Sequence, residues 1–585
     1  MANSEKDDFS FKNYFIPLTN SKVVTWIILI GVLVFFNMFF NAFVWDDRTF
    51  IQYNPDMLHL NLFYLLGPNM FNNISAGQYR AFIAIYFTFF HTFFGNNAFF
   101  YHIAQLTIHI TNTILIFYFL KKFFRVPISF FLSLLFLIHP MQVESVSYIA
   151  SSDNPLFTLF GLIALILSTK EELSYKQTIL IFLLLILSIM SKETGIFFTF
   201  LVVIYRFLFL KKEKIIFLTS GIIVILAYFF LRFFIAGVYF SKVLLAPISR
   251  LSFTERLLNI PSILLYYIKT LLFPVNLAII QYWTVTKINF SNFYLPLFID
   301  IFLILLLLIL GFFVYKKQKQ MFGLLIFFVV WIILGFGIYS QIFALNMTVA
   351  DRWFYFPFIG ILGILGIVLN IFKDFITKHK KIFITFTIII LFLFSIRTVI
   401  RNSNWQNPIM LYTHDIKVMD NFELENTLGG ELNSAGDRSE AFIHFKKSVK
   451  LFPHVTNLFN LGLSYEQKSD YKNAEKYYQK AFNSDTLGSV PYPHKKLEII
   501  YVRYSLVTLQ TDPKSALGII NEGLKDYPND ATMWYVKAEC EYKLNNYNQA
   551  LDAAEKAYQI VPNDSNAANL YNRILNKLPI DTSIK

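Results

Sequence analysis

The sequence predicts an all-α protein in two parts, a polytopic helical membrane domain over residues 1–400 and a helical repeat domain over residues 401–585. The chain is 56% hydrophobic and only 15% charged, whereas a soluble chain carries roughly 25% charged residues. Long apolar runs are confined to the first part, and small and aromatic residues recur at regular spacing in the second. This composition excludes a soluble enzyme, a disordered chain and a nucleic-acid-binding domain.

The net charge of +13 is divided unevenly along the chain. Residues 401–585 hold 21 basic and 22 acidic residues, whereas residues 1–400 hold 30 basic and 16 acidic ones. The excess of basic residues in 1–400 lies in short loops between apolar runs. The positive-inside rule places such loops in the cytoplasm. A nucleic-acid partner is not expected, because its binding surface would be on a polar domain. The five basic loops are 121–125, 170–176, 211–214, 316–319 and 373–381.

This assignment predicts eleven spans, with the N-terminus inside and the repeat domain outside. The first run has no small-residue cleavage site and is interpreted as a retained span. Several spans are shorter than the ~20 residues that cross the hydrocarbon core. Two further apolar stretches, 79–94 and 261–274, fall on the outer side as helices in the outer leaflet, with two extra crossings as the alternative. The spans are 23–43, 99–120, 126–139, 155–169, 177–190, 195–210, 215–235, 296–314, 321–340, 353–372 and 382–399.

The repeat domain is marked by alanines at 441, 474, 516 and 550, which are spaced by 33, 42 and 34 residues. This spacing resembles the tetratricopeptide repeat, a pair of antiparallel helices of roughly 34 residues. Such repeats stack into a concave surface that commonly binds peptides; a purely structural scaffold is the alternative. The expected repeats are 422–455, 455–488, 497–530 and 531–564, with an insertion at 484–496 and a capping helix at 564–578.

Ionisable groups in or beside membrane spans are costly and therefore mark functional sites. Nearly all of these groups lie on the predicted outer side. A transport path would instead need polar groups through the full depth of the bilayer. One-sided clustering indicates chemistry at the outer face of the membrane. The outer groups are Asp46, Asp47, Arg80, His102, His109, His139, Glu144, Asp153, Lys192, Glu193, Asp351 and Arg352.

Six sequence blocks follow one another along the membrane part and precede the repeats. The blocks are Trp45–Asp46–Asp47, Tyr79–Arg80, Tyr101–His102 with His109, His139–Pro140 with Glu144 and Asp153, Lys192–Glu193–Thr194–Gly195, and Asp351–Arg352 with Tyr355. In this order they resemble the transmembrane and tetratricopeptide-repeat O-mannosyltransferases. The resemblance implies a membrane-embedded GT-C glycosyltransferase fold and a sugar donor linked to polyprenyl phosphate, a membrane lipid. It also implies a protein or peptide acceptor, held by the repeats.

A glycosyl acceptor hydroxyl needs a general base, and the candidates are Asp47 and Asp46 in the first outer loop. Adjacent side chains point in different directions, so one acid is expected to meet the acceptor while the other fixes the loop; both acting as caps is the alternative. One base with direct displacement implies inversion at the anomeric carbon.

The leaving phosphate needs cations, and Arg352 offers a planar fork that suits it, with Lys192 and Arg80 as helpers. An ion pair with Asp351, or snorkelling, is the alternative for Arg352. His102 and His109 are expected to orient the acid or the phosphate, or else to join helices by hydrogen bonds. The remaining supporting residues are His139, Glu144, Asp153, Glu193, Asp351 and Tyr355.

No cofactor is predicted with certainty, although His139, Asp46 and Asp47 are candidates for assembling a divalent metal site. The predicted function is transfer of a sugar, with mannose favoured, from a polyprenyl-phosphate donor to hydroxyl groups of exported protein. The alternatives are a GT-C transferase or ligase that builds cell-surface glycan or lipid, and a non-enzymatic membrane scaffold. The composition favours a bacterial inner membrane with the site in the periplasm; in a eukaryote the same topology places it at the endoplasmic reticulum.

Overall fold

The computed structural model describes residues 18–58, 61–67, 77–210, 212–239, 246–484, 497–562, 564–576 and 578. Within these ranges the regular elements are helical, apart from one isolated antiparallel bridge between Gln281 and Val349. This confirms the predicted all-α class. The chain forms two compact units, Met1–Met419 and Asp420–Lys585, and each is described by itself.

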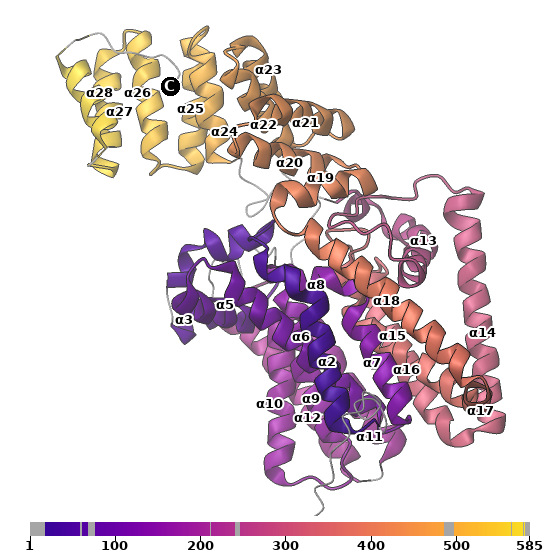
Figure 1. Ribbon diagram of the computed structural model, residues 1–585. Helices are drawn as coiled ribbons and strands as arrows, with labels where there is room; N and C mark the ends of the chain where they lie inside the picture. The colour runs from indigo at the N-terminus through magenta and orange to yellow at the C-terminus, as the bar shows by residue number, and fades with distance from the viewer. Residues whose placement is uncertain are drawn as a thin grey trace, which may run out of the picture. The chain divides into compact units, whose positions relative to one another are not determined.

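The first unit is a bundle of long helices, drawn from indigo to orange in Figure 1. The helices α5, α8 and α13 gather toward one end of this bundle, at the top in Figure 1. Its α-helices are α2 (Asn20–Phe35), α3 (Leu62–Leu66), α5 (Ala81–Phe94), α6 (Ala98–Leu120), α7 (Val126–Ile138), α8 (Val143–Ser147), α9 (Asp153–Ser168), α10 (Tyr175–Ser191), α11 (Ile196–Phe209), α12 (Lys214–Phe230), α13 (Phe253–Leu272), α14 (Leu295–Lys317), α15 (Phe322–Tyr339), α16 (Tyr355–Ile371), α17 (Lys373–Lys378), α18 (Lys380–Asn404) and α19 (Pro408–Val418).

Each of the eleven predicted spans coincides with a helix. Eight helices among the described residues are long and apolar enough to cross a membrane, and nine if the bent pair Val126–Ile138 and Pro140–Ser147 is one span. The other two are α10 and α11, which have 17 and 14 residues, fewer than the ~20 that cross the hydrocarbon core. The protein is therefore polytopic by the length and composition of its helices, and full crossing by α10 and α11 stays a prediction.

The two stretches that the sequence assigns to the outer leaflet are also helical. The first is α5, a 14-residue apolar helix. The second belongs to α13, a 20-residue helix that contains Pro261. Figure 1 shows both at the same end of the bundle as α8, as two helices on one side of a membrane would be. Their depth in the bilayer stays a prediction.

Close approach of helices organises the interior of this unit. A Cβ atom on Gly161 of α9 would lie 2.0 Å from the Phe198 ring of α11, and one on Gly363 of α16 would lie 2.2 Å from the Phe328 ring of α15. Small residues are needed at such contacts because lipid supplies little hydrophobic drive between helices. By contrast, only 11% and 6% of the apolar windows of α14 and α18 are buried within the chain, which leaves their side chains available to lipid.

The second unit is a series of antiparallel helix pairs, as the sequence predicts. Four helix pairs and one further helix are described in this unit, and the bounds of the predicted repeats and capping helix stay a prediction. Most of the predicted insertion at 484–496 lies outside the described residues. The helices are α20 (Phe422–Ser434), α21 (Arg438–Leu451), α22 (Val455–Gln467), α23 (Tyr471–Phe482), α24 (Glu498–Thr508), α25 (Pro513–Asp526), α26 (Ala531–Lys543), α27 (Tyr547–Ile560) and α28 (Ser565–Leu575).

The end of the first unit differs from the predicted domain boundary at residue 400, which falls within α18. The compact unit continues to Met419 because a buried ion pair joins α18 to α19. Arg401 donates to both carboxylate oxygens of Asp415, at 2.6 and 3.1 Å. The amide of Ile279 donates to the same carboxylate at 2.7 Å. The helix α19 therefore belongs with the membrane unit.

Replacing Gly161 with Ala tests the close contact between α9 and α11. The new methyl group would overlap the Phe198 ring, and we expect the free energy of unfolding to fall by about 1–3 kcal/mol. Thermal unfolding of the purified chain in detergent measures this change. The control is Gly337→Ala in α15, where the described structure has no atom within 4 Å of the new Cβ. Equal effects of the two substitutions would contradict the packing.

Candidate active site

The loop after the first span makes a sharp turn at Trp45. Its φ of +50° lies in the left-handed region, which bulky residues rarely adopt and which is often found at functional sites. The turn brings the Trp45 ring onto the ring of Tyr148, with centroids 5.4 Å apart and planes 23° from parallel. The two acids that follow Trp45 then point to different partners.

Asp47 joins two segments that are far apart in the sequence. One carboxylate oxygen accepts from the amide of Ala150 at 2.6 Å, and the other accepts from the amide of Val44 at 3.1 Å. The side chain is fully buried. Burial raises the pKa of the Asp47 carboxyl to about 8, although these backbone hydrogen bonds oppose the rise. Asp47 is thereby engaged in holding the loop.

Asp46 is half-buried and has a different environment. Its Oδ2 accepts a hydrogen bond from the Tyr148 hydroxyl at 2.8 Å. Burial raises the pKa of the Asp46 carboxyl, while the hydrogen bond from Tyr148 and the positive charge of Arg352 act in the opposite direction. The sequence gives both acids as base candidates, and the geometry distinguishes the accessible one, Asp46, from the buried one, Asp47.

Arg352 lies beside the same aromatic pair, in the short helix Asp351–Phe354 before α16. Its guanidinium carbon lies 5.6 Å from the Trp45 ring centroid and 6.0 Å from that of Tyr148. The guanidinium pairs with Glu144 of α8, which also accepts from the Arg352 amide at 2.9 Å. The alternative pairing of Arg352 with Asp351 is not formed, since Asp351 accepts instead from the Tyr266 hydroxyl at 2.7 Å.

Lys192 and Arg80 meet at Asp153. The Lys192 ammonium lies 3.3 Å from the Asp153 carboxylate and donates to the Asn154 side chain at 2.6 Å. The Arg80 guanidinium lies 2.7 Å from the same carboxylate. Burial lowers the pKa of Lys192 to about 8, and the nearby charge of Arg352 adds to this decrease. The three cations predicted to bind phosphate therefore act on one another within one polar region.

Glu193 pairs with a further cation, Arg232, which was not identified from the sequence. It pairs with Arg80 at 3.3 Å and with Arg232 at 3.4 Å, and it accepts from the Tyr79 amide at 3.0 Å. Arg232 lies near the end of the predicted span 215–235, away from that span's basic loop. An arginine at the end of an apolar run opposite its basic loop is a signal that could have identified it.

The histidines contact helices and backbone. His102 contacts the carbonyl of Asn41 at 3.1 Å, which supports the loop after the first span. His109 of α6 bridges the Tyr355 hydroxyl at 3.0 Å and the Leu137 carbonyl at 2.9 Å, and so joins α6, α7 and α16. His139 contacts the Leu271 carbonyl at 3.0 Å. The contacts of His109 fit the alternative interpretation, in which the histidines join helices by hydrogen bonds, whereas His102 contacts a loop carbonyl.

No group of three or more His, Cys, Asp or Glu side chains suited to a metal ion occurs in the described part of the chain. The possible set of His139, Asp46 and Asp47 is therefore not assembled. His139 directs its other ring nitrogen to the Met141 amide, and Asp47 is occupied by backbone amides.

Tyr148 is the second feature that the sequence did not reveal. It lies within the Glu144–Asp153 block but carries no charge, so it is not among the ionisable groups that mark the site in the sequence. Its ring also lies 5.7 Å from that of Trp405. A tyrosine between two acids of a recognised block is the only signal that could have identified it.

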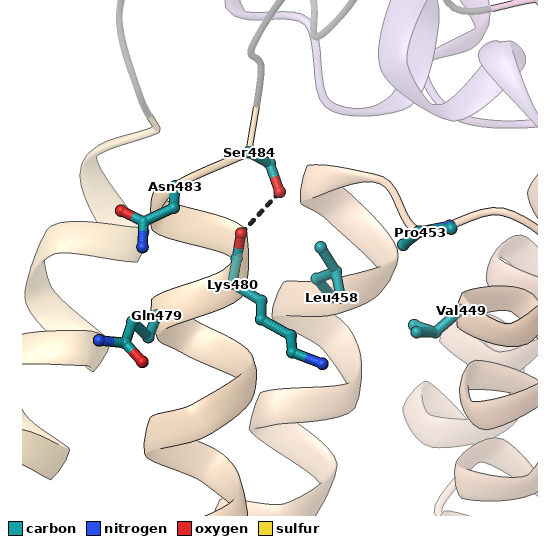
Figure 2. A pocket seen from close by; sticks show the side chains of 7 residues that line it. All are labelled: Val449, Pro453, Leu458, Gln479, Lys480, Asn483 and Ser484. Atoms are coloured by element: carbon teal, nitrogen blue, oxygen red, sulfur yellow. Dashed lines mark hydrogen bonds between the residues drawn. The ribbon is translucent and has the colours of Figure 1, made fainter.

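The second unit contains a pocket of its own, shown in Figure 2. It has a volume of about 560 Å³ and is lined by α21, α22, α23 and their connections. Lys480 is the ionisable side chain among its lining residues, and the Ser484 hydroxyl donates to the Lys480 carbonyl at 2.6 Å. The mixed lining suits a binding function better than catalysis. The lining residues are Val449, Pro453, Leu458, Gln479, Lys480, Asn483 and Ser484.

Comparison with known proteins supports the resemblance stated from the sequence. The chain is 27% identical over 445 residues to a protein O-mannosyl-transferase of Caenorhabditis elegans, a match that covers 73% of this chain. The match spans 62% of the relative's length. The similarity to protein O-mannosyltransferases predicted from the six sequence blocks is thereby confirmed.

Other matches were found to one family model and to solved structures. Residues 467–557 match a family model described as anaphase-promoting complex, cyclosome, subunit 3. Among solved structures, YrrB, titled a TPR protein with an unusual peptide-binding site, is 16% identical and covers 28% of this chain and 82% of its own, with a TM-score of 0.25. The Cut9–Hcn1 hetero-tetramer of the APC/C is 14% identical and covers 85% and 89%, with a TM-score of 0.26. These scores are too low to support an argument.

Separate alanine substitutions test whether Asp47, rather than Asp46, is the acid that stabilises the loop. Asp47→Ala leaves two buried amides without an acceptor, and we expect it to lower the free energy of unfolding by about 2–4 kcal/mol. Asp46→Ala removes one hydrogen bond from a half-buried group, and we expect a loss of about 1 kcal/mol. Thermal unfolding in detergent compares them. A larger loss for Asp46→Ala would contradict the assignment of Asp47 as the residue that holds the loop.

Proposed function

We propose that this chain is a membrane glycosyltransferase that moves a hexosyl group, mannose by its similarity to protein O-mannosyl-transferases, from a polyprenyl-phosphate donor to hydroxyl groups of exported protein. The observation that carries the proposal is the placement of Asp46 and Arg352 around one aromatic pair, Trp45 and Tyr148. A base and an anion-binding guanidinium are thereby held in one site, as transfer from a phosphate-linked sugar requires.

In the proposed reaction, Asp46 accepts the proton of the acceptor hydroxyl as its oxygen attacks the anomeric carbon. The bond between that carbon and the phosphate oxygen breaks, and the configuration inverts because there is one direct displacement. General-base assistance of this kind contributes roughly 10²–10⁴-fold to the rate. The partial exposure of Asp46 lets it meet an acceptor, whereas Asp47 has both oxygens bound to amides.

The leaving phosphate keeps its negative charge, which Arg352, Lys192 and Arg80 offset. The Nη1 of Arg352 pairs with Glu144, while its Nη2 contacts the Met347 sulfur at 3.6 Å. A thioether is a weak acceptor, so a phosphate oxygen readily replaces it. Glu144 thereby fixes one side of the guanidinium fork and leaves the other for the donor.

The repeat unit supplies the acceptor side of this proposal. Stacked helix pairs offer an extended surface for a peptide, and the pocket between α21, α22 and α23 is one place for a side chain of that peptide. The proposed topology places the reaction on the side opposite the basic loops. In a bacterium this is the periplasmic face of the inner membrane, and in a eukaryote it is the lumenal face of the endoplasmic reticulum.

Asp46→Asn tests the proposed base. The substitution keeps the shape of the side chain but removes its basicity, and we expect product formation to fall at least 100-fold while the chain stays folded. Intact-mass analysis of exported proteins, from cells that lack this chain and are complemented with wild type or variant, measures the transferred hexoses. The control is Asp374→Asn, the same change on the exposed surface of α17.

Two results of that analysis would count against the proposal. If no exported protein loses a hexose in cells that lack the chain, the acceptor is not protein. If the Asp46→Asn variant restores full hexose transfer, the carboxylate is not the base.

Arg352→Lys tests the proposed phosphate contact. Lysine keeps the positive charge but loses the planar fork that can bind Glu144 and a phosphate at once. We expect the KM for the polyprenyl-phosphate donor to rise at least tenfold, with the KM for the acceptor unchanged. Arg438→Lys on exposed α21 is the control. An unchanged donor KM would remove Arg352 from the phosphate site.

A further inference from the structure

Tyr148 stands at the centre of the candidate site, although it carries no charge. It is 3% exposed and connects α8 to the short helix Ile149–Ser152. Its ring centroid lies 5.4 Å from that of Trp45 and 5.7 Å from that of Trp405. Its hydroxyl donates to Asp46 at 2.8 Å. Two aromatic neighbours therefore set the direction in which the hydroxyl points.

The backbone around Tyr148 is held as firmly as its ring. The Tyr148 carbonyl accepts from the Gln105 side chain of α6 at 3.2 Å. Two residues later, the Ala150 amide donates to Asp47 at 2.6 Å. Because Asp47 also holds the loop that carries Asp46, the donor and the acceptor of the Tyr148–Asp46 hydrogen bond are fixed by one network.

Several charged groups surround this hydrogen bond. Asp47 belongs to the same loop as Asp46, and Arg352 approaches from the segment before α16 with its partner Glu144 from α8. Arg401 of α18, paired with Asp415, lies 5.5 Å from the ring of Trp405. Burial, together with the charges of Asp46 and Asp47, raises the pKa of Tyr148 well above its ordinary value. The hydroxyl is therefore protonated at working pH and acts as a donor.

We propose that Tyr148 is a positioning residue for the transfer reaction, which holds Oδ2 of Asp46 through its hydroxyl so that Oδ1 faces the acceptor. This inference rests on the proposed function and adds a residue to it. A hydrogen bond to a carboxylate favours the ionised form. The hydroxyl thus also keeps Asp46 available as a base against the burial that favours its protonation.

The sign of the pH effect follows from this contact. Loss of the hydroxyl raises the pKa of Asp46, so a higher pH is needed to ionise it. The acidic limb of the kcat/KM profile then moves to higher pH, while the basic limb stays in place. A residue that only packs would not move either limb, since phenylalanine retains the ring beside Trp45 and Trp405.

Tyr148→Phe in the full-length chain tests the proposal without depending on activity. Carbodiimide with an amine nucleophile labels protonated carboxyls, and peptide mass spectrometry follows the labelling of Asp46 across pH. We expect the midpoint to move upward by about one to two pH units, because a hydrogen bond to a charged group is worth roughly 1.5–3 kcal/mol. An unchanged midpoint would overturn the inference.

The matched control is Tyr266→Phe, which removes the hydroxyl that donates to Asp351 at 2.7 Å. It should leave the labelling midpoint of Asp46 at its wild-type value. The pH profiles of kcat/KM for wild type and Tyr148→Phe separate the proposed transferase function from the proposed role of Tyr148. A wild-type chain without transferase activity, but with the labelling shift, rejects the proposed function and with it the role of Tyr148 in transfer, while the control of the Asp46 pKa by Tyr148 stands. An active wild type whose acidic limb does not move in the variant rejects the role of Tyr148 alone.

Discussion

The carboxylate of Asp47 is the contact on which the rest of the site depends. By accepting from the amides of Val44 and Ala150, it joins the loop after the first span to the segment that leads into α9. Trp45 and Asp46 belong to the first segment and Tyr148 to the second, so the aromatic stack and the Tyr148–Asp46 hydrogen bond form only when this junction is made. The unusual φ of Trp45 is retained because the same junction fixes the backbone on both sides.

The cations of the site are each balanced by a carboxylate, as buried charges must be. Arg352 pairs with Glu144, and Lys192 and Arg80 share Asp153. Such pairing keeps the cations in place before a donor arrives, and it lets a phosphate bind by replacing weak contacts rather than by ordering free side chains. This preorganisation is the usual source of electrostatic stabilisation in a transfer reaction.

Much of this arrangement is predictable from the sequence, because the period and length of apolar runs determine where helices form. Each predicted span coincides with a helix, and the spacing of the alanines indicates the helical repeat class of the second unit. The identity of the accessible acid was not predictable, since Asp46 and Asp47 are adjacent and differ only in backbone contacts to Val44 and Ala150. Tyr148 and Arg232 were missed because their importance comes from neighbours more than 30 residues away, and the local sequence signals at both positions are weak.

In the proposed reaction a base and a phosphate-binding cation act together around Trp45 and Tyr148. A cryo-electron microscopy structure of the chain with a polyprenyl-phosphate mannose bound would show whether they do. We expect the phosphate within hydrogen-bonding distance of the Arg352 guanidinium and the anomeric carbon facing Asp46. A donor whose phosphate lies among the basic loops at the opposite end of the helices, with its sugar remote from Asp46, would contradict it.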